Sequence, residues 1–484
     1  MKKIIFLLLL FIQSIFFCFG QDYVPFAGLI QSSTIKADLS VLASDSLEGR
    51  ETAEPGMAKA IAYTSSRFQQ MGLTPAFSKS FTQEVPFIKW TNKAIRVYMG
   101  EAELEYGIHY YMNAPTVASK TSRTARVFTI LDLYGPINQT INETSAIFID
   151  ATNTKGISND SLNDAINARL KELGPFKPSV IIIERPFDGE REKRQMRRMQ
   201  NGMISLPDTN QKAYTPVVFV KPGLFEKKSK KSKGRKSITL SNEIKVSTEG
   251  LRVTCRNVGA LIEGTTQKDE VVVITAHLDH LGKRDSLVYY GADDDGSGCA
   301  AILNMAAAFS EAKRQGRNPK RSILFLLFTG EEKGLLGSSY YTENPAFPMG
   351  KTIANLNIDM IGRSDTVPRP STKYVYLIGS DKMSTDLHQI SENTNKECCS
   401  INMDYTYNDA NHPMRLYYRS DHYSFVKKGV PAIFYFTGLH SDYHKPTDTV
   451  DKIDFEKTVA ISQLIFSTAW ELANRTERIR VDKP

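Results

Sequence analysis

Cysteine is scarce in this sequence, with five residues in a chain of 484. Cys18 lies in an N-terminal apolar segment, and the remaining Cys255, Cys299, Cys398 and Cys399 are too few for a disulfide scaffold. None of them follows the Cys-x-x-Cys spacing of a zinc site, so any metal must be bound by histidines and carboxylates. We expect the two adjacent cysteines not to pair with each other because of strain, and their partners stay open.

Long apolar runs are missing, with one exception at the N-terminus. Met1-Lys2-Lys3 precedes an almost unbroken apolar run over residues 4–19, which predicts a secretory signal peptide at residues 1–20. An uncleaved membrane anchor is the alternative, but the run is short for a span. No other segment has about 18 consecutive apolar residues. We therefore expect a secreted or periplasmic protein with no stable membrane insertion after signal cleavage.

A strong excess of one charge is also absent, because 61 Lys and Arg oppose 53 Asp and Glu, for a formal charge of +8. This mild excess gives little support to nucleic-acid binding, and we predict none. Much of it is clumped at residues 190–200 and 227–236, which we interpret as solvated, mobile loops. The alternative is that these basic runs bind an acidic surface. The overall composition, 41% hydrophobic and 24% charged, is typical of soluble globular proteins.

The pattern of apolar residues changes along the chain. Residues 33–73 are predicted to be helical, and short β-rich runs with one intervening helix follow between 125 and 220, as in a compact α+β insert. From residue 256, near-continuous apolar strands alternate with helices. This alternation predicts an α/β fold with a mainly parallel sheet covered by helices on both faces.

Side chains that can bind metal follow the apolar strands of this last region. These are His277 and Asp279, Glu331 and Glu332, Asp359, His440 and His444, with Asp293, Asp294 and Asp295 in the loop GADDDGSG. Ligands of such sheets bind beyond the carboxyl ends of the strands, so we expect these side chains to converge there. Buried charges must be paired or bound to metal. Histidines with carboxylates and no cysteine suit zinc, with manganese or cobalt as alternatives.

Charge counting favours two metal ions. Two divalent cations carry four positive charges, which three ligand carboxylates and one bridging hydroxide would neutralise. A further carboxylate that binds no metal is then needed to accept the proton of the water. The adjacent pair Glu331 and Glu332 offers one residue for each purpose.

Six motifs carry a family resemblance. HLDH, GADDDGSG, FTGEEKGLLGS, LNIDMIGR, YRSDHYSF and YHKPTDT resemble, in this order, the motifs of the di-zinc aminopeptidases, a family that also contains glutamate carboxypeptidase and aminopeptidase Y. The resemblance covers roughly residues 34–90 and 256–470. It implies the zinc exopeptidase fold, a mixed sheet between helices, with an inserted β-rich domain of the protease-associated (PA) type. The domains expected are the signal peptide at 1–20, the N-terminal part of the peptidase domain at 21–112, the PA-like insert at 113–240 and the di-zinc peptidase domain at 241–484.

The resemblance also implies a set of metal ligands. His277 and Asp359 correspond to ligands of one zinc, and Glu332 and His444 to ligands of the other. Asp294 corresponds to the bridging carboxylate, and its peptide bond to the next residue is often cis in the family. His440 is the rival of His444, but the spacing of the YHKPTDT motif favours the latter.

Three further roles follow from the same resemblance. Glu331 corresponds to the general base, and Tyr443 to the hydroxyl group that stabilises the oxyanion. Arg419 resembles a residue near the amino end of the substrate. Asp279, two residues along the strand from His277, is expected to support that ligand from behind.

We therefore expect an enzyme, a metallo-aminopeptidase with two zinc ions that hydrolyses N-terminal residues from peptides. A carboxypeptidase or dipeptidase on the same scaffold is the second hypothesis, because the family contains both polarities. A non-catalytic peptide-binding relative is the third, and a one-zinc glutaminyl cyclase is weaker still. The side-chain specificity and the oligomeric state cannot be read from the sequence.

Overall fold

The structure is a computed structural model that describes residues 23–112, 120–134, 136–137, 140–152, 157–187, 189–207, 215–232, 235–409 and 411–483. The signal peptide expected at residues 1–20 lies outside these ranges. Within them, no helix combines the length and the apolar character needed to cross a membrane.

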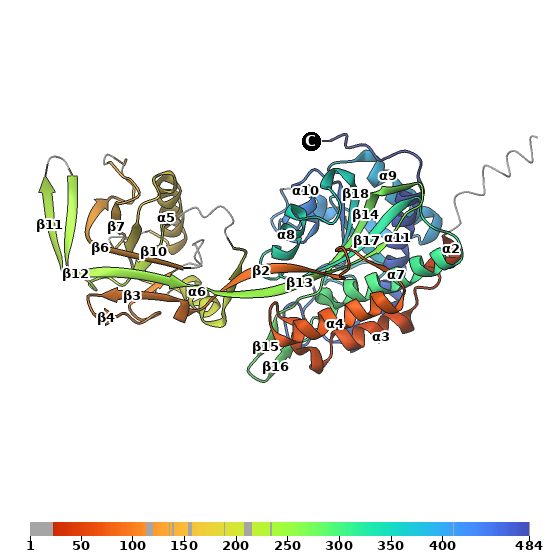
Figure 1. Ribbon diagram of the computed structural model, residues 1–484, viewed down its shortest axis with the longest axis horizontal. Helices are drawn as coiled ribbons and strands as arrows, with labels where there is room; N and C mark the ends of the chain where they lie inside the picture. The colour runs from red at the N-terminus through yellow and green to blue at the C-terminus, as the bar shows by residue number, and fades with distance from the viewer. Residues whose placement is uncertain are drawn as a thin grey trace, which may run out of the picture. The chain divides into compact units, whose positions relative to one another are not determined.

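The chain forms two compact units (Figure 1). Unit 1 comprises the described residues up to Val85 together with Thr254–Pro484, and unit 2 comprises Pro86–Val253. Two long strands, β2 (Thr82–Trp90) and β13 (Leu251–Ile262), lead from the first unit into the second and back.

Unit 2 extends beyond the insert expected at residues 113–240 on both sides. The strand β3 (Ile95–Met99), which precedes that range, pairs with the end of β12 (Arg235–Glu249), which follows it. The two strands complete one sheet, so the unit begins and ends outside the predicted boundaries. Strand pairing of this kind joins residues about 150 positions apart, and the alternation of apolar residues does not reveal it.

The sheet of unit 1 confirms the expected mixed, mainly parallel architecture. Its order is β20-β19-β21-β18-β14-β17-β13-β2-β9, in which β9 (Met203–Ser205) pairs with the end of β2 that belongs to unit 2. The bounds not yet given are β14 (Gln267–His277), β17 (Arg321–Phe328), β18 (Thr352–Ile358), β19 (Tyr374–Ile378), β20 (Asn402–Asp404) and β21 (Ala432–Phe436). The central strands β17, β14, β18 and β21 are parallel, whereas β13 and β19 join their two sides antiparallel.

Helices cover both faces of this sheet (Figure 1). They are α3 (Ser32–Leu42), α4 (Pro55–Gln70), α7 (Gly298–Arg314), α8 (Leu336–Glu343), α9 (Thr385–Cys398), α10 (His422–Val426) and α11 (Phe455–Asn474). The ring of Phe325 on β17 lies 6.0 Å from Phe309 on α7, whereas the ring of Phe328, three residues further, lies 6.2 Å from Phe425 on α10. Because side chains alternate along a strand, these contacts place α7 and α10 on opposite faces.

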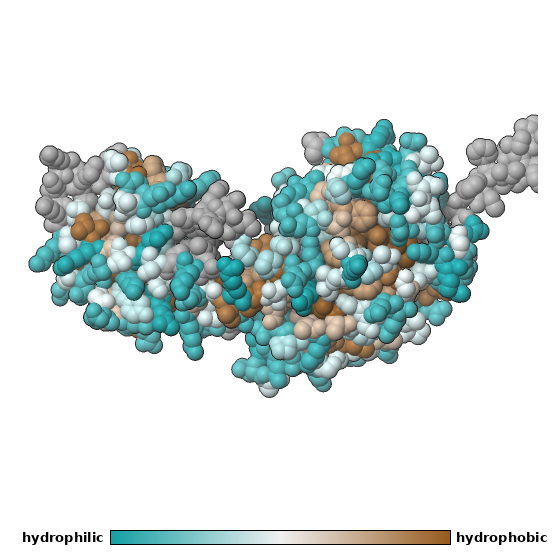
Figure 2. All heavy atoms as spheres, viewed as in Figure 1, coloured by the Kyte–Doolittle hydropathy of each residue, from teal (hydrophilic) through white to brown (hydrophobic). Residues whose placement is uncertain are grey.

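Unit 2 contains a second mixed sheet, with the order β4-β3-β12-β6-β7-β8-β10-β5. Its further elements are β4 (Ala102–Glu103), β5 (Tyr110–Met112), β6 (Lys120–Leu131), β7 (Ala146–Asp150), α5 (Asn159–Leu173), β8 (Val180–Glu184), α6 (Glu190–Asn201) and β10 (Val217–Val220). Apolar residues of the sheet form two core clusters, one around Phe128 and Phe148 and the other around Ile149 and Phe219. This is the α+β character expected of the insert. Figure 2 shows mainly hydrophilic residues on the visible surface of each unit.

The described residues of both basic runs lie in regular secondary structure and not in loops, contrary to our expectation. Residues 190–200 fall within α6, where Met199 is fully buried and Glu192 forms a buried ion pair of 3.1 Å with Arg185. Residues 227–232 form β11 (Lys227–Ser232), which pairs antiparallel with β12. Two buried residues, Met199 and Glu192, anchor α6, whereas β11 is held by its pairing with β12. The surrounding charges hide both features in the sequence.

The two adjacent cysteines are paired, which corrects the expectation that they would not be. Cys398 and Cys399 form a disulfide at the end of α9, where the backbone of Cys399 leaves helical geometry and the two side chains can meet. Cys255 and Cys299 are free and buried.

Candidate metal centre

The carboxyl ends of the four central parallel strands carry the site. His277 is the last residue of β14, and Asp359 comes directly after β18. Glu331 and Glu332 follow β17, and His444 follows β21. Parallel strands end at the same edge of a sheet, and this is why residues far apart in the sequence converge.

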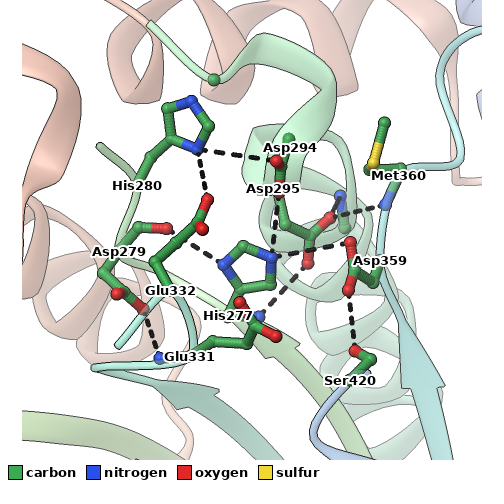
Figure 3. A network of polar contacts seen from close by, with 12 residues as sticks. His277, Asp279, His280, Asp294, Asp295, Glu331, Glu332, Asp359, Met360 and Ser420 are labelled. Carbon is green, nitrogen blue, oxygen red and sulfur yellow. Dashed lines mark hydrogen bonds and ion pairs between the residues drawn. The ribbon is translucent and has the colours of Figure 1, made fainter. Parts of the chain in front are cut away.

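The first group of donors is formed by His277, Asp294 and Asp359 (Figure 3). His277 Nε2 lies 3.1 Å from Asp294 Oδ1 and 3.5 Å from Asp359 Oδ1. The other oxygen of Asp359 accepts a hydrogen bond of 2.7 Å from Ser420 Oγ, so this carboxylate is held from behind.

The second group lies on the other side of Asp294. His444 Nε2 is 3.2 Å from Asp294 Oδ2 and 3.3 Å from Glu332 Oε1. His280 Nδ1 approaches the same two oxygens, at 3.8 and 3.0 Å. Asp294 therefore turns one oxygen to each group, which is the arrangement of a bridging carboxylate.

These donors fit zinc. Two atoms that each bind zinc at about 2.0–2.1 Å in a tetrahedral site lie about 3.3–3.4 Å apart. The separations of 3.1–3.5 Å that His277 and His444 make with their carboxylate partners match this value. Asp294 Oδ2 and Glu332 Oε1 are buried without a hydrogen-bond donor in the part of the chain that the structure describes. Buried oxygens of this kind require a cation or a donor.

The pKa values of the donor side chains are shifted by their mutual contacts. Burial opposes the charge of Asp294, but hydrogen bonding to His277 and the charge of His280 hold its pKa well below the usual range. Burial likewise opposes the charge of His444, yet its contacts with Asp294 and Glu332 raise its pKa to about 10. Without metal, protons on the histidines balance the carboxylates, so metal binding must displace these protons.

The loop that carries Asp294 is fixed by its neighbours. The Asp294–Asp295 peptide bond is cis, as the resemblance implies. Asp295 accepts hydrogen bonds from the amides of His277, Gly298 and Met360, at 3.2, 2.9 and 3.2 Å. Three separate segments are thereby tied to one carboxylate. This role of Asp295 was not predicted, although the residue stands in the run of three aspartates.

Asp448 holds the same loop from the other side. Its carboxylate accepts hydrogen bonds from the amides of Asp293, at 3.1 and 3.0 Å, and of Asp294, at 3.2 Å. Ser420 and Asp448 lie in motifs that the sequence analysis quoted, but only the contacts reveal what they support.

Asp279 supports the site differently from the expectation. Its backbone carbonyl, not its carboxylate, lies 3.0 Å from His277 Nδ1. The buried carboxylate accepts hydrogen bonds from the Glu331 amide at 3.1 Å and from Thr52 Oγ1 at 2.7 Å. Asp279 thus orients His277 through its backbone and Glu331 through its side chain.

Glu331, which precedes Glu332 in the chain, belongs to neither donor group. Burial raises the pKa of its carboxyl group well above the usual value, and the negative charges of Glu332 and Asp359 add to this effect. A carboxyl group in this state holds a proton more readily than an exposed glutamate does.

The remaining predicted residues surround His444. Tyr443 stacks on its ring, with centroids 3.8 Å apart, and Arg419 Nη2 lies 3.5 Å from Tyr443 Oη. His440 Nε2 instead lies 3.3 Å from Asp293 Oδ2, and it belongs to neither donor group. The structure therefore brings His444, and not its rival His440, to Asp294.

Comparison with known proteins places this geometry in a family. Residues 257–469 match peptidase family M28. A probable leucine aminopeptidase of Arthroderma otae is 30% identical over 224 residues, which cover 45% of this chain and 57% of the relative. One from Trichophyton verrucosum is 30% identical over 227 residues, which cover 46% and 58%. The chain thus spans somewhat more than half the length of these curated relatives.

Solved structures share the fold. An aminopeptidase from Aneurinibacillus sp. strain AM-1 superposes with a TM-score of 0.53 at 17% identity, over 95% of this chain and 97% of that one. A zinc aminopeptidase from Bacillus subtilis gives 0.50 at 18% identity, over 93% and 97%. The likeness shows the fold alone at these identities, and the family match rests on the sequence. The motif resemblance is thus confirmed, because residues 257–469 of this chain match the model of peptidase family M28.

Proposed function

We propose that this protein is a secreted or periplasmic zinc aminopeptidase, which hydrolyses N-terminal residues from peptides with two metal ions and a glutamate base. The observation that carries the proposal is the sharing of Asp294 between two donor groups, with one carboxylate oxygen turned to each. The signal peptide at residues 1–20 and a PA-type identity for unit 2 are parts of the same proposal.

His277 and Asp359 would hold one zinc, Glu332 and His444 would hold the other, and Asp294 would bridge them. Bound zinc polarises a substrate carbonyl and lowers the pKa of a water molecule. The protein fixes the donors before any metal arrives, through Ser420 behind Asp359 and the carbonyl of Asp279 behind His277.

Glu331 is suited to act as the general base. It belongs to neither donor group, so its carboxylate is free to take a proton from the attacking water and give it up again. The amide of Glu331 is fixed by Asp279, so the carboxyl group starts from a defined position. We infer that the same proton then passes to the leaving amine.

Tyr443 is suited to stabilise the oxyanion. Burial raises the pKa of its phenol, and the charges of Asp294 and Glu332 raise it further, so the hydroxyl keeps its proton and can donate it in a hydrogen bond. Arg419 beside it would face the substrate.

Aminopeptidase polarity is supported by the names of the relatives, which are leucine aminopeptidases. A carboxypeptidase or dipeptidase on the same scaffold is the alternative, and a non-catalytic peptide-binding relative would lack hydrolysis altogether. The same donor groups would serve an aminopeptidase or a carboxypeptidase. The two activities are therefore distinguished by testing which blocked terminus of a peptide prevents hydrolysis.

One experiment tests the metal content and the polarity together. Zinc per chain is measured in the purified protein, which is then incubated with one short peptide in free, N-acetylated and C-amidated form. We expect two zincs per chain and hydrolysis that acetylation blocks and amidation does not. The opposite blocking pattern would establish a carboxypeptidase, and absence of bound metal would refute the proposal.

A matched pair of variants separates binding from catalysis in this assay. Glu331→Gln should retain both zincs but lose about 10²- to 10⁴-fold in kcat, because the amide cannot accept the proton. Glu343→Gln makes the same chemical change at an exposed residue that pairs with Lys428, and it should behave as the wild type.

A further inference from the structure

His280 is a buried histidine of the site to which the family resemblance assigns no role. Its side chain is fully buried, and among the described residues neither ring nitrogen makes a hydrogen bond of regular geometry. Its Nδ1 faces Glu332 Oε1 at 3.0 Å and Asp294 Oδ2 at 3.8 Å (Figure 3). Burial of an imidazole without a well-formed hydrogen bond costs free energy unless another partner, such as a metal ion, interacts with the ring.

The backbone around His280 holds its ring in this position. The amide of His280 donates a hydrogen bond of 3.2 Å to the carbonyl of Arg50. Gly291, at φ +57°, packs so closely that a Cβ atom there would lie 2.5 Å from Cγ of the His280 ring. A glycine at position 291 therefore creates the space that the imidazole occupies next to the carboxylates.

The donor atoms of His280, Asp294 and Glu332 lie close enough together to hold one metal ion, and His444 contacts the same two carboxylates. Atoms that share a zinc at about 2.0–2.1 Å lie about 2.9–3.6 Å apart for bond angles between 90° and 120°. Three of the four contacts from His280 and His444 to the two carboxylates, at 3.0, 3.2 and 3.3 Å, fall in this range, and the fourth, at 3.8 Å, lies just outside it. The two imidazole rings are 5.9 Å apart at an angle of 67°, so they approach the carboxylates from different directions.

We propose that Nδ1 of His280 is an additional protein ligand of the second metal, together with Asp294, Glu332 and His444. The inference rests on the proposed two-metal function and deepens it. The second site would then have two imidazole ligands where the first has one. Neutral imidazole nitrogen is a preferred ligand of zinc, so the second site should hold its ion more tightly than it would without His280.

The competing explanation is that His280 only orients Glu332 through a hydrogen bond. Two substitutions separate these roles. His280→Asn places an amide nitrogen close to the position of Nδ1, so it keeps a donor for Glu332 but loses the metal-binding nitrogen. His280→Ala removes both. His388→Asn makes the same change on α9, at a histidine that contacts Ser380 and belongs to neither donor group.

The experiment measures zinc affinity by competition with a chromophoric chelator, and the visible spectrum of the cobalt-substituted protein. We expect both His280 variants to weaken the second site by about 10- to 100-fold or more, with the first site unchanged within about twofold and an altered cobalt spectrum. His388→Asn should match the wild type. Wild-type affinities and an unchanged spectrum in His280→Asn would overturn the proposal.

A structure of the zinc-loaded wild-type protein decides the question even where the variants do not fold. Nδ1 of His280 should lie about 2.0–2.1 Å from the second zinc. Two bound zincs with His280 outside bonding distance would overturn this inference and leave the proposed function intact. A wild-type protein that binds fewer than two zincs would overturn both.

Discussion

At the scale of single residues, the surroundings decide what each buried histidine does. His277 and His444 face carboxylates, which raise their pKa values against the effect of burial. His422 is fully buried, like His277 and unlike the partly exposed His444, and it stacks on Phe434 with ring centroids 5.0 Å apart. Burial among apolar neighbours lowers its pKa to about 3. The first two are suited to bind cations, whereas the third serves the core as a neutral ring.

This contrast predicts how stability responds to acid. The unfolded chain binds a proton at His422 near pH 6.5, whereas the folded protein keeps the ring neutral down to about pH 3. The free energy of unfolding should therefore fall as the pH drops through this window, by up to about 5 kcal/mol from this one residue.

The measurement compares urea unfolding of the wild type and of His422→Phe at several pH values between 6.5 and 3. The phenylalanine keeps the stacked ring but cannot titrate, so the stability of this variant should fall less steeply with acid. Equal slopes for the two proteins would refute the prediction, whatever the difference in their absolute stabilities.

At the scale of elements, a short segment near the N-terminus joins the loops of the site. The 3-10 segment η1 (Asp45–Arg50) ends in a fully buried arginine. Arg50 donates hydrogen bonds to the carbonyls of Leu278, Tyr290 and Gly291, at 2.9, 2.8 and 2.9 Å. The first of these residues adjoins His277, and the last two precede the loop of Asp294. One guanidinium group thus ties the two metal-binding segments together.

Gly49, the residue before Arg50, is needed for η1 to lie so close to these carbonyl groups. Gly49 has φ +69°, and a Cβ atom there would lie 2.3 Å from the carbonyl oxygen of Tyr289. The absence of a side chain lets η1 come close enough for Arg50 to reach the carbonyls.

We expect Arg50→Lys to destabilise the protein by about 3 kcal/mol, because an ammonium group cannot reach carbonyls that lie in different directions. Zinc affinity should fall as well, since both loops lose a support. Urea unfolding and chelator competition measure the two effects. Arg480→Lys is the control: it changes an exposed ion pair with Asp386 and should cost less than about 1 kcal/mol. Equal effects of the two substitutions would contradict a positioning role for Arg50.

At the scale of the whole molecule, the two units have separate hydrophobic cores. In unit 1, Leu326 and Phe328 of the sheet pack with Phe425. In unit 2, Phe128 and Phe148 belong to a cluster made entirely of residues from that unit. All members of both donor groups lie in unit 1. The free energy of metal binding should therefore stabilise unit 1 only.

Removal of metal tests this separation. Ions present at about 1,000 times their dissociation constant contribute about 4 kcal/mol per site to the folded state. Calorimetry should show two transitions, and a chelator should lower the temperature of one of them while leaving the other in place. Readdition of zinc should restore the first transition. A common shift of both transitions would show that the units unfold together.

Much of the fold and of the site could be predicted from the sequence, because the signals are local. A strand such as residues 271–276 is marked by its own apolar run, and each donor follows directly after such a run. The sequence by itself therefore determined the α/β class of unit 1, the order of its strands and helices along the chain, and the chemical type of the donors. It also determined the family match, since the motifs occur in order.

The tertiary structure alone decided what depends on residues distant in the sequence. The choice between His440 and His444 required knowing which ring faces Asp294, and the place of His280 depends on the space left by Gly291. The boundaries of unit 2 depend on the pairing of β3 with β12. A residue's own neighbours in the chain determine its secondary structure and its chemistry. Its contacts, and with them its role in a site, arise only when separate segments are packed together.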